Sequence, residues 1–392
     1  MENKPRGRKL DFQDKLLLYK KKNRRQTDSQ VLLLLLALIV AYLSVQVINV
    51  FTASAEITVK KDENAKFTAT MVGDLMFGRN VAHVVERKGY EYLFRYVEPY
   101  FLNADYNTGN LENPIILRDE EEYEDQLPEK NIYLHAKADV APFLDELNFT
   151  NVNVANNHLM DYGLAGLMET LETFQKTDTA LIGIGLNKTE SGQISYNEIN
   201  DMTVATLGGT DVGYQWGYST DRQAGANRIR LADMLPLIRE ASQTADLVIV
   251  HAHWGVEYDS TATPRQQEIG RAMVNAGADI VIGHHSHTLQ PVEVYNDGII
   301  MYSLGNFVFD QGWTKTKDSV LTQYKVMNNG DRILELTPLT IKEASPTPLT
   351  GPLAGIQFRR MTQLLTKELT DGVNWEIIDD KIILNLGPKQ TR

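Results

Sequence analysis

The sequence contains no cysteine among its 392 residues. This absence excludes disulfide bonds, iron–sulfur clusters and cysteine-ligated zinc, because each of them needs thiol sulfur. It is compatible with an exported protein from an organism that does not rely on disulfides. Any metal ion bound by this chain must therefore be held by histidine, aspartate, glutamate or asparagine.

Basic residues are scarce outside the first 30 positions. Residues 1–30 carry ten basic and four acidic side chains, a balance of +6, whereas the rest of the chain carries 29 basic and 47 acidic ones, a balance of −18. A nucleic-acid-binding domain normally presents a basic face. The composition therefore argues against nucleic acid as a partner, and it opposes the unassisted binding of any polyanion.

Charged residues are also missing from a stretch of 21 positions, residues 31–51. About 20 apolar residues suffice to cross a bilayer as a helix, and the basic residues before the stretch favour a cytoplasmic N-terminus. We therefore expect a cytoplasmic tail (1–30), a single-pass membrane anchor (31–51), a linker (52–65) and a main domain outside the cell. The alternative is a secretory signal peptide cleaved after Ala55, because residues 53–55 are small.

The main domain is expected over residues 66–340, and a C-terminal extension over residues 341–392. Apolar runs alternate with helical stretches, which is typical of an α/β fold with a largely buried sheet. The extension is predicted to start with Ser/Pro/Thr-rich coil at 344–348, followed by a helix near 353–370 and one short strand. The acidic segment 119–125 is predicted to be a solvated loop, with a surface cation site as the alternative. Helices are predicted at 79–88, 139–147, 164–176, 231–243 and 264–276, and strands at 67–72, 151–154, 180–184, 202–208, 246–251, 279–282 and 298–303.

Histidine is rare, yet three of the eight histidines lie within residues 284–287. They follow the apolar run 280–282, which is predicted to be a buried strand ended by Gly283. A second pair, His251 and His253, ends an earlier apolar strand. Loops at strand ends carry much of the chemistry of α/β folds, and neutral imidazole is a common transition-metal ligand. A solvated polar turn is the plainer alternative, but the clustering favours a metal site.

Other polar residues follow predicted strands in the same way, and together they form a mixed nitrogen and oxygen donor set. An anionic bridge, terminal imidazoles and a neutral oxygen donor suit two divalent ions that activate water and hold a phosphoryl group. His158, beside this set, could protonate a leaving group. Singly, Asp74 could be a helix N-cap, Glu112 a solvated strand-end residue and Asn157 a turn residue. The predicted metal ligands are Asp74, Glu112, Asn157, His253, His285 and His287.

The order of these residues resembles that of the calcineurin-like metallophosphoesterases. Five local motifs are similar to a narrower branch, the CapA/PgsA family of poly-γ-glutamate capsule biosynthesis proteins. The resemblance spans about residues 66–340, and the basic tail with its single anchor also fits this family. The five motifs are Asn156–Gly163 (NNHLMDYG), His253–Tyr258 (HWGVEY), Ala276–Asp279 (AGAD), Gly283–His287 (GHHSH) and Tyr302–Phe307 (YSLGNF).

The resemblance implies a two-sheet β-sandwich flanked by helices, preceded by one transmembrane helix, with a dinuclear centre of divalent ions such as Mn, Zn or Fe. It supports the ligand set above and places His158 where these phosphoesterases keep a catalytic histidine. One departure is Met76, which stands where the family pattern Asp-x-His has an imidazole. A thioether is a poor ligand for such ions, so one half of the centre should be weakened or completed by another residue. Additional pocket candidates are Arg79, Asp161, His251, Glu257, His284 and Asn306. Structural support is the alternative role for Arg79, Glu257 and Asn306, and a place in the core is the alternative for His251.

The resemblance also implies partners at the membrane of a Gram-positive cell. These are the poly-γ-glutamate polymer, a cytoplasmic Mur-ligase-like amide ligase and a small integral-membrane subunit. A domain outside the cell has no access to cytoplasmic ATP, so ligation should belong to the partners. Two functions remain open: a metal-dependent hydrolase of phosphoesterase type, and a non-catalytic polymer-binding or assembly subunit with structural metals. Nothing specific supports a nuclease or nucleotidase.

Overall fold

The computed structural model describes residues 11–52 and 59–389. The expected cleavage sequence at 53–55, the first ten residues of the basic tail and part of the linker lie outside this description. The described residues form two compact units. One is built on the N-terminal helix together with residues 350–354, and the other contains the rest of the chain.

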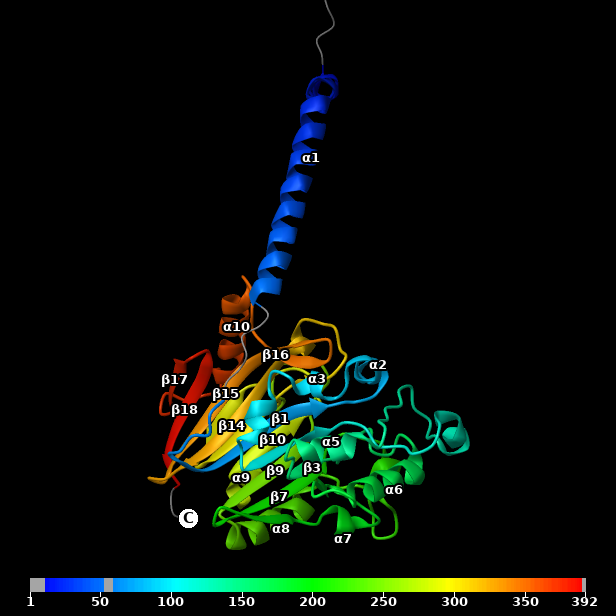
Figure 1. Ribbon diagram of the computed structural model, residues 1–392, viewed down its shortest axis with the longest axis vertical. Helices are drawn as coiled ribbons and strands as arrows, with labels where there is room; N and C mark the ends of the chain where they lie inside the picture. Colours follow the sequence, from blue (N-terminus) through cyan, green and yellow to red (C-terminus); the bar gives the residue numbers. More distant parts are fainter. Residues whose placement is uncertain (1–10, 53–58, 390–392) are drawn as a thin grey trace, which may run out of the picture. The chain divides into compact units, whose positions relative to one another are not determined.

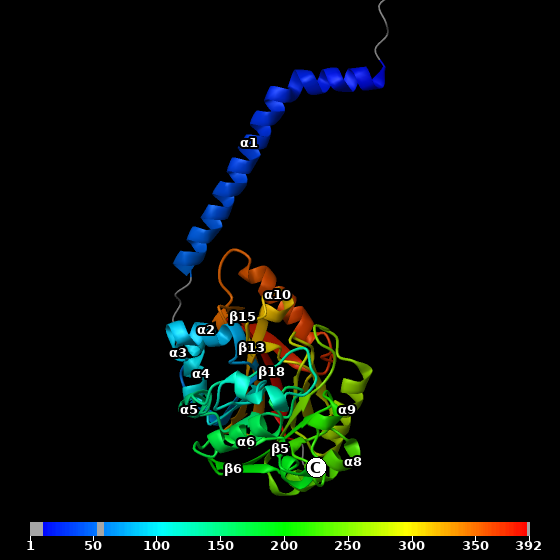
Figure 2. The same cartoon turned by 90° about the vertical axis from the view of Figure 1, so that its right-hand side faces the viewer.

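Helix α1 (Phe12–Thr52) is 41 residues long and contains the predicted anchor. Its large apolar side chains between Val31 and Leu43 are exposed. Among the described residues, no single helix is both long enough and apolar enough to span a membrane. The segments Phe12–Arg24 and Asp28–Ser44 reach the necessary length and hydropathy only together, as a pair bent by 58° (Figure 2). The membrane anchor therefore stays a prediction.

The larger sheet combines strands from the N-terminal part and from the C-terminal part of the main unit's sequence (Figure 1). Their order is β17-β18-β15-β14-β1-β2-β3-β4, and two short strands are added, with β13 beside β1 and β16 beside β15. Strands β1 to β4 are mutually parallel, whereas β14, β15, β17 and β18 form antiparallel pairs. The bounds are β1 Ala65–Leu75, β2 Tyr106–Leu111, β3 Asn151–Asn153, β4 Ala180–Ile182, β13 Asn306–Val308, β14 Asp318–Met327, β15 Asp331–Lys342, β16 Ser345–Pro348, β17 Asn374–Ile378 and β18 Lys381–Pro388.

A second sheet has the order β11-β12-β10-β9-β7-β6. Its central strands β7, β9, β10 and β12 are parallel, and β6 and β11 close its edges in antiparallel pairs. The bounds are β6 Ser195–Ile199, β7 Met202–Thr210, β9 Leu247–His253, β10 Ile280–His284, β11 Val292–Tyr295 and β12 Gly298–Met301, while β5 (Ile184–Gly185) and β8 (Gly225–Ala226) form a separate small pair.

Side chains from the two sheets meet in one buried layer. Phe67, Ala69 and Met71 on β1 belong to the same apolar cluster as Ile280 and Ile282 on β10. Successive residues of a strand point to opposite faces of its sheet, so the intervening residues face outward. The period-2 pattern of these buried strands therefore places one apolar core between the sheets.

Helices cover the two outer faces (Figure 2). Val72 and Leu111 of the larger sheet pack with apolar residues of α2 to α6, whereas Val250 and Val281 of the smaller sheet pack with α8 and α9. Helix α10 adds Met361 to the layer between the sheets. The α/β class predicted from the sequence is confirmed. The bounds are α2 Arg79–Lys88, α3 Glu91–Phe94, α4 Glu98–Leu102, α5 Val140–Glu146, α6 Gly163–Phe174, α7 Lys188–Ser191, α8 Leu231–Thr244, α9 Pro264–Ala276 and α10 Ala354–Thr366, with 3₁₀ turns η1 Glu120–Gln126, η2 Gln215–Gly217 and η3 Lys315–Lys317.

Several local predictions were wrong because tertiary pairing overrides composition. The coil predicted at 344–348 is mostly strand β16, with Pro346 opposite Ile341 and Pro348 opposite Leu339 of β15. Proline is tolerated on a short edge strand because it removes only an outward N–H. Residues 120–125 of the acidic segment belong to the 3₁₀ turn η1 and not to a loop, although its acidic side chains are solvated as predicted. The C-terminus forms two strands instead of one.

A close approach of three strands fixes the backbone before the histidine loop. A Cβ on Gly283 would lie 2.0 Å from the carbonyl oxygen of Tyr302 and 2.6 Å from Nε1 of Trp254. Trp254 Nε1 also donates a hydrogen bond of 2.9 Å to that same carbonyl. Glycine is therefore required at this point for steric reasons.

We expect Gly283→Ala to lower the free energy of unfolding by about 2 kcal/mol, the usual cost of overpacking a closely packed site. The matched control is Gly355→Ala in α10, where a Cβ would have no neighbour within 4 Å. That change should be neutral or stabilising by about 0.5 kcal/mol. Urea unfolding of both variants measures the difference, and equal midpoints would contradict the steric argument.

Candidate metal centre

The candidate site lies where strands of both sheets end. In the parallel register, Asp74 of β1 stands opposite Asn110 of β2 and Asn306 of β13. In the other sheet, His253 of β9 stands opposite His284 of β10. Ligands in open α/β sheets bind at the carboxyl ends of the strands, so this register brings polar side chains from distant segments to one level.

Glu112 is the central residue of the site and is fully buried. Its Oε2 accepts a hydrogen bond of 2.5 Å from Nδ2 of Asn110, but its Oε1 has no hydrogen-bond partner. That Oε1 lies 3.9 Å from Nε2 of His253 and 3.9 Å from Nε2 of His287. Metal–ligand bonds of about 2 Å let one ion connect two atoms at such a separation. Oε1 of Glu112 thus has the geometry of a metal ligand, with an imidazole nitrogen at a suitable distance on either side.

Burial also affects the protonation of Glu112. Burial raises its pKa well above the ordinary value, and the negative charge of Asp74 raises it further. A buried carboxylate without partners is costly. Ligand atoms of Asp74, Glu112 and His253 lie within 4.8 Å of one another, a separation that suits a divalent ion. A cation there would offset the desolvation of the carboxylates.

One side of the centre is formed by Asp74 and His287. Oδ2 of Asp74 lies 3.1 Å from Nδ1 of His287, and Nδ2 of Asn110 donates a hydrogen bond of 2.9 Å to Oδ1 of Asp74. Burial acts to raise the pKa of Asp74, but the adjacent imidazoles of His284 and His287 outweigh burial and hold that pKa well below its usual range. For His287, burial lowers the pKa, but the bond to Asp74 and nearby carboxylates raise it to about 9.

The other side is formed by Asn157, His253 and His285. Oδ1 of Asn157 lies 2.9 Å from Nε2 of His253, and the rings of His253 and His285 are 4.8 Å apart. Burial and a neighbouring imidazole lower the pKa of both histidines, that of His285 to about 3. Both rings are therefore neutral near pH 7, as metal ligation requires. Nδ1 of each ring is buried without a hydrogen-bond partner.

The backbone conformation of the histidine loop directs the side chains of His285 and His287 toward the metal centre. His285 and His287 have positive φ angles of 88° and 53°. Such angles are uncommon for residues with a side chain and are found at functional sites, where the surrounding structure maintains them. Ser286, between them, donates a hydrogen bond of 2.9 Å from Oγ to the carbonyl of Thr288.

His251 lies behind the ligands. Its Nδ1 is 2.9 Å from Nε2 of His284, its Nε2 is 2.9 Å from Oγ1 of Thr108, and the two imidazole rings stack at 5.2 Å. Nδ1 of His284 in turn lies 3.3 Å from Oδ1 of Asp74. The structure thus places His251 in a buried polar chain that supports His284 and, through it, Asp74.

Met76 does not reach the site as a ligand. Its sulfur accepts a hydrogen bond of 3.1 Å from the backbone N–H of Gly78. Its side chain is fully buried in the apolar cluster between the larger sheet and helices α2 to α6. Asn306 lies closer to the centre: its Oδ1 is 2.9 Å from Nδ1 of His287. Nδ2 of Asn306 donates to Oε1 of Gln311 and to the carbonyl of Thr316, which fixes the orientation of the amide.

Arg79 and Glu257, two of the additional pocket candidates, lie at the rim of the candidate metal centre. Arg79 forms an ion pair with Asp310, and its guanidinium lies 5.6 Å from the ring centroid of Phe309. Glu257 is exposed. Its charge contributes to raising the pKa values of both Glu112 and His287.

His158 is held by Asp161. Nδ1 of His158 donates a hydrogen bond of 2.6 Å to Oδ2 of Asp161, which also accepts one of 2.7 Å from the backbone N–H of Leu134. Burial lowers the pKa of His158, and the charge of Lys130 adds to this, although Asp161 opposes both. Because Nδ1 carries the proton in this arrangement, Nε2 is the ring nitrogen available for proton transfer.

Lys130 is a site residue that the sequence did not indicate. Its side chain is only 5% exposed and forms an ion pair with Asp161. Its Nζ donates a hydrogen bond of 3.0 Å to the carbonyl of Asn157 and lies 3.3 Å from Nδ1 of His158. The residue follows the acidic segment in a polar stretch without a motif, so only the tertiary fold brings it to the site.

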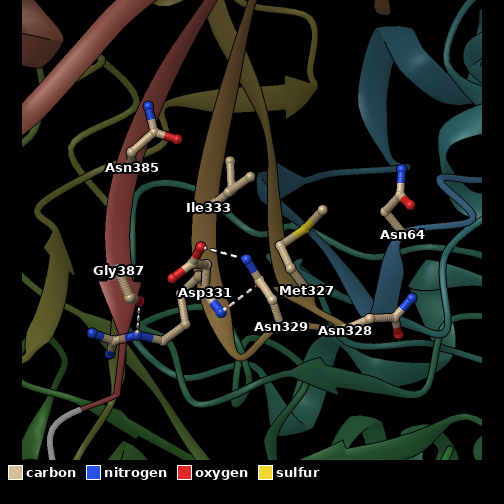
Figure 3. A pocket seen from close by; sticks show the side chains of 9 residues that line it. Asn64, Met327, Asn328, Asn329, Asp331, Ile333, Asn385 and Gly387 are labelled. Atoms are coloured by element: carbon tan, nitrogen blue, oxygen red, sulfur yellow. Dashed lines mark hydrogen bonds between the residues drawn. The ribbon is translucent and has the colours of Figure 1, made fainter.

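A cavity of about 520 Å³ lies elsewhere, beside the turn between β14 and β15 (Figure 3). Amide, apolar and charged side chains line it, including those of Asn64, Ile333 and Arg332, and Nδ2 of Asn329 donates a hydrogen bond of 2.7 Å to Asp331. None of the predicted metal ligands lines this cavity. Its size alone therefore does not identify it as the functional site.

Lys130→Met should lower the free energy of unfolding by about 3 kcal/mol, because it leaves the buried Asp161 carboxylate without its cation. The matched control is Lys137→Met, whose lysine is 66% exposed and pairs with Glu86. Surface pairs contribute about 0.5 kcal/mol or less. Urea unfolding compares the two variants, and similar losses would show that Lys130 is not a structural cation.

Metal affinity should increase as the pH rises from 6.5 to about 9, because His287, with its pKa raised to about 9, must lose a proton before Nε2 can ligate. The raised pKa of Glu112 acts in the same direction. Titration calorimetry with Mn²⁺ or Zn²⁺ in buffers of different ionisation enthalpy measures the protons released. Affinity that is independent of pH, without proton release, would contradict this account of the site.

The part of the chain that carries these residues matches known proteins. A family model described as "Bacterial capsule synthesis protein PGA_cap" matches residues 68–311. Over 389 residues the chain is 43% identical to "Capsule biosynthesis protein CapA" of Bacillus anthracis, which covers 97% of this chain and 92% of that protein. Over 329 residues it is 41% identical to "PGA biosynthesis protein CapA" of Bacillus subtilis (strain 168), with 84% of each chain covered.

Among solved structures, a 5'-nucleotidase precursor from Thermus thermophilus matches with a TM-score of 0.41 and 14% identity, over 76% of this chain and 58% of that one. A TM-score this low supports no inference about function. The family match and the two CapA relatives are much stronger, since they extend over most of the chain. The chain therefore belongs to the CapA/PgsA family of bacterial capsule synthesis proteins.

Proposed function

We propose that this chain is a membrane-anchored subunit of poly-γ-glutamate capsule synthesis, and that its main domain is a metal-dependent hydrolase of phosphoesterase type. The names of the two CapA relatives support the pathway. The observation that supports the chemistry is the unpaired Oε1 of Glu112, buried at 3.9 Å from the Nε2 atoms of both His253 and His287. A bridging carboxylate in this position suits two ions.

Each side of the proposed centre has its own ligands. Asp74 and His287 would hold one ion with Glu112, and the second ion would be held by Glu112, Asn157, His253 and His285. Two such ions, of Mn, Zn or Fe, would supply an activated water and neutralise charge on a phosphoryl group. Nε2 of His158, unprotonated in the neutral ring, would first accept a proton and then return it as imidazolium to the leaving oxygen. Asp161 keeps that ring oriented by its bond to Nδ1, and Lys130 keeps Asp161 in place.

A second candidate is a non-catalytic subunit that binds the polymer or assists its assembly. Met76 favours it, because its sulfur is bonded to the N–H of Gly78 and leaves the half-site of Asp74 and His287 one imidazole short. In that case the metals would be structural or would bind polymer carboxylates. The His158–Asp161 pair, which leaves Nε2 of His158 available for proton transfer, favours the hydrolase.

Location and partners are part of the same proposal. The apolar part of α1, preceded by basic residues, would anchor the chain with its N-terminus in the cytoplasm and its main domain outside. The cytoplasmic Mur-ligase-like ligase and the small integral-membrane subunit would perform the ATP-dependent ligation. The polymer would be the ligand of the main domain, and nucleic acid would not be a partner. The balance of −18 beyond residue 30 opposes both polyanions, so the polymer would need the metal ions or a local basic pocket to bind.

Glu112→Gln should remove at least one of about two bound ions and reduce hydrolysis of bis-p-nitrophenyl phosphate by about a hundredfold or more, because it removes the charge of the bridge. Glu257→Gln, an exposed carboxylate at the rim, is the control and should keep both ions. Metal analysis and hydrolysis are measured on the same detergent-purified full-length samples.

The results of this experiment separate the two candidate functions. Two ions with metal-dependent hydrolysis in the wild type, both lost in Glu112→Gln, support the hydrolase. Bound metal without turnover supports the binding subunit. A wild-type protein that binds no metal when Mn²⁺ or Zn²⁺ is supplied would overturn both forms of the metal centre.

A further inference from the structure

Exposed aromatic side chains lie at one end of the metal centre, beside His287. The ring of Tyr258 is 6.2 Å from that imidazole, and the ring of Trp313 is 5.2 Å from Tyr258. Tyr258 is 39% exposed and Trp313 is 68% exposed. We call these two residues the first aromatic pair.

A second aromatic pair, Tyr214 and Trp216, lies at the other end of the centre. The two rings stack with centroids 5.0 Å apart and an interplanar angle of 10°. Both residues line one small cavity together with Asn157. Nζ of Lys130, bonded to the carbonyl of Asn157, is 5.7 Å from the ring centroid of Tyr214. Each aromatic pair therefore adjoins a different predicted ligand, one on each side of Glu112.

Local bonds hold the first pair in place. The N–H of Tyr258 donates a hydrogen bond of 2.7 Å to the carbonyl of Ser286, and its hydroxyl accepts one of 3.3 Å from Nε2 of Gln311. The carbonyl of Trp313 accepts bonds from Thr316 and Lys317, which close a tight turn. Aromatic rings that are exposed but already ordered lose little entropy when a ligand covers them. Exposed aromatic side chains beside a cleft mark binding surfaces.

Electrostatics show which part of a ligand the pairs would contact. Two basic side chains beside the centre are paired with carboxylates, Arg79 with Asp310 and Lys130 with Asp161, and Glu257 adds a negative charge at the rim. Positive charge beside the pairs comes from the exposed Arg228, which donates to Gln215 between Tyr214 and Trp216, and from the exposed Lys315, two residues after Trp313. The carboxylates of a polyanion would face these groups or the metal ions. The aromatic faces can instead take the uncharged part of such a polymer, namely its amide planes and methylene groups.

We propose that the two aromatic pairs are subsites for the backbone of a γ-linked glutamate chain that lies across the metal centre. This inference rests on the proposed pathway. A γ-linked chain carries two methylene groups and an amide in each backbone unit, with the carboxylate as a short branch. An α-linked chain of the same charge has no backbone methylene. The subsites thus contact the apolar backbone, and the branch carboxylates face the solvent or the ions.

Binding of γ-linked glutamate oligomers to the full-length protein in detergent tests this assignment by titration calorimetry. Trp313→Ala and Tyr214→Ala should each raise Kd about tenfold, the equivalent of losing one aromatic contact of about 1.4 kcal/mol. The matched control is Trp375→Ala: this tryptophan is 38% exposed, on the edge strand β17. It should leave Kd unchanged, and all three variants should keep the wild-type metal content. An α-linked oligomer of equal length should bind more weakly than the γ-linked one.

Other outcomes would overturn the assignment. No binding to the wild type, unchanged Kd in both Trp313→Ala and Tyr214→Ala, or an equal loss in Trp375→Ala would each do so. An uncharged glycan oligomer that replaces the γ-linked chain with the same dependence on both residues would assign the surface to a sugar polymer. Failure of phosphodiester hydrolysis overturns the hydrolase alone, because polymer binding is measured independently of turnover.

Discussion

Buried ionisable groups are concentrated at the ends of the strands, and the arrangement of the candidate metal centre depends on how their burial is compensated. Glu112 has an oxygen without a partner, and the imidazoles of His253 and His285 are buried with unpaired nitrogens. Such groups are costly in a dry interior unless a cation compensates them. Ligand atoms of Asp74, Glu112 and His253 lie within 4.8 Å of one another, which suits a divalent cation. Such a cation would offset the cost of burying these polar side chains.

Precise placement of these groups comes from the backbone around them. The apolar layer between the sheets holds β1 and β10 at a fixed distance. Gly283 allows the close approach of Tyr302, the residue that follows β12. Positive φ angles at His285 and His287 then turn two neighbouring imidazoles inward. A polar chain through His251 supports the site from behind. Packing energy is thereby used to maintain a conformation that the loop would not adopt alone.

Charge distribution connects the site with its ligand. Beyond residue 30 the chain has a balance of −18, and the basic residues Arg79 and Lys130 near the centre are engaged in ion pairs. In the proposed arrangement, the metal ions hold the carboxylates of the polymer, and the two aromatic pairs, around Tyr214 and Trp313, contact its uncharged backbone.

The sequence by itself determined the fold class and the metal-ligand candidates. Apolar periodicity is a local property, so helices at 79–88 and 264–276 were predicted within a residue, and clustered histidines indicated metal chemistry directly. Strand β16 was missed because its proline-rich composition predicts coil, and only pairing with β15 makes it a strand. Lys130 was missed because nothing local distinguishes it from a solvated lysine. The role of His251 and the pairing of Met76 with Gly78 were likewise decided by tertiary contacts, since the direction of a side chain depends on neighbours that are distant in sequence.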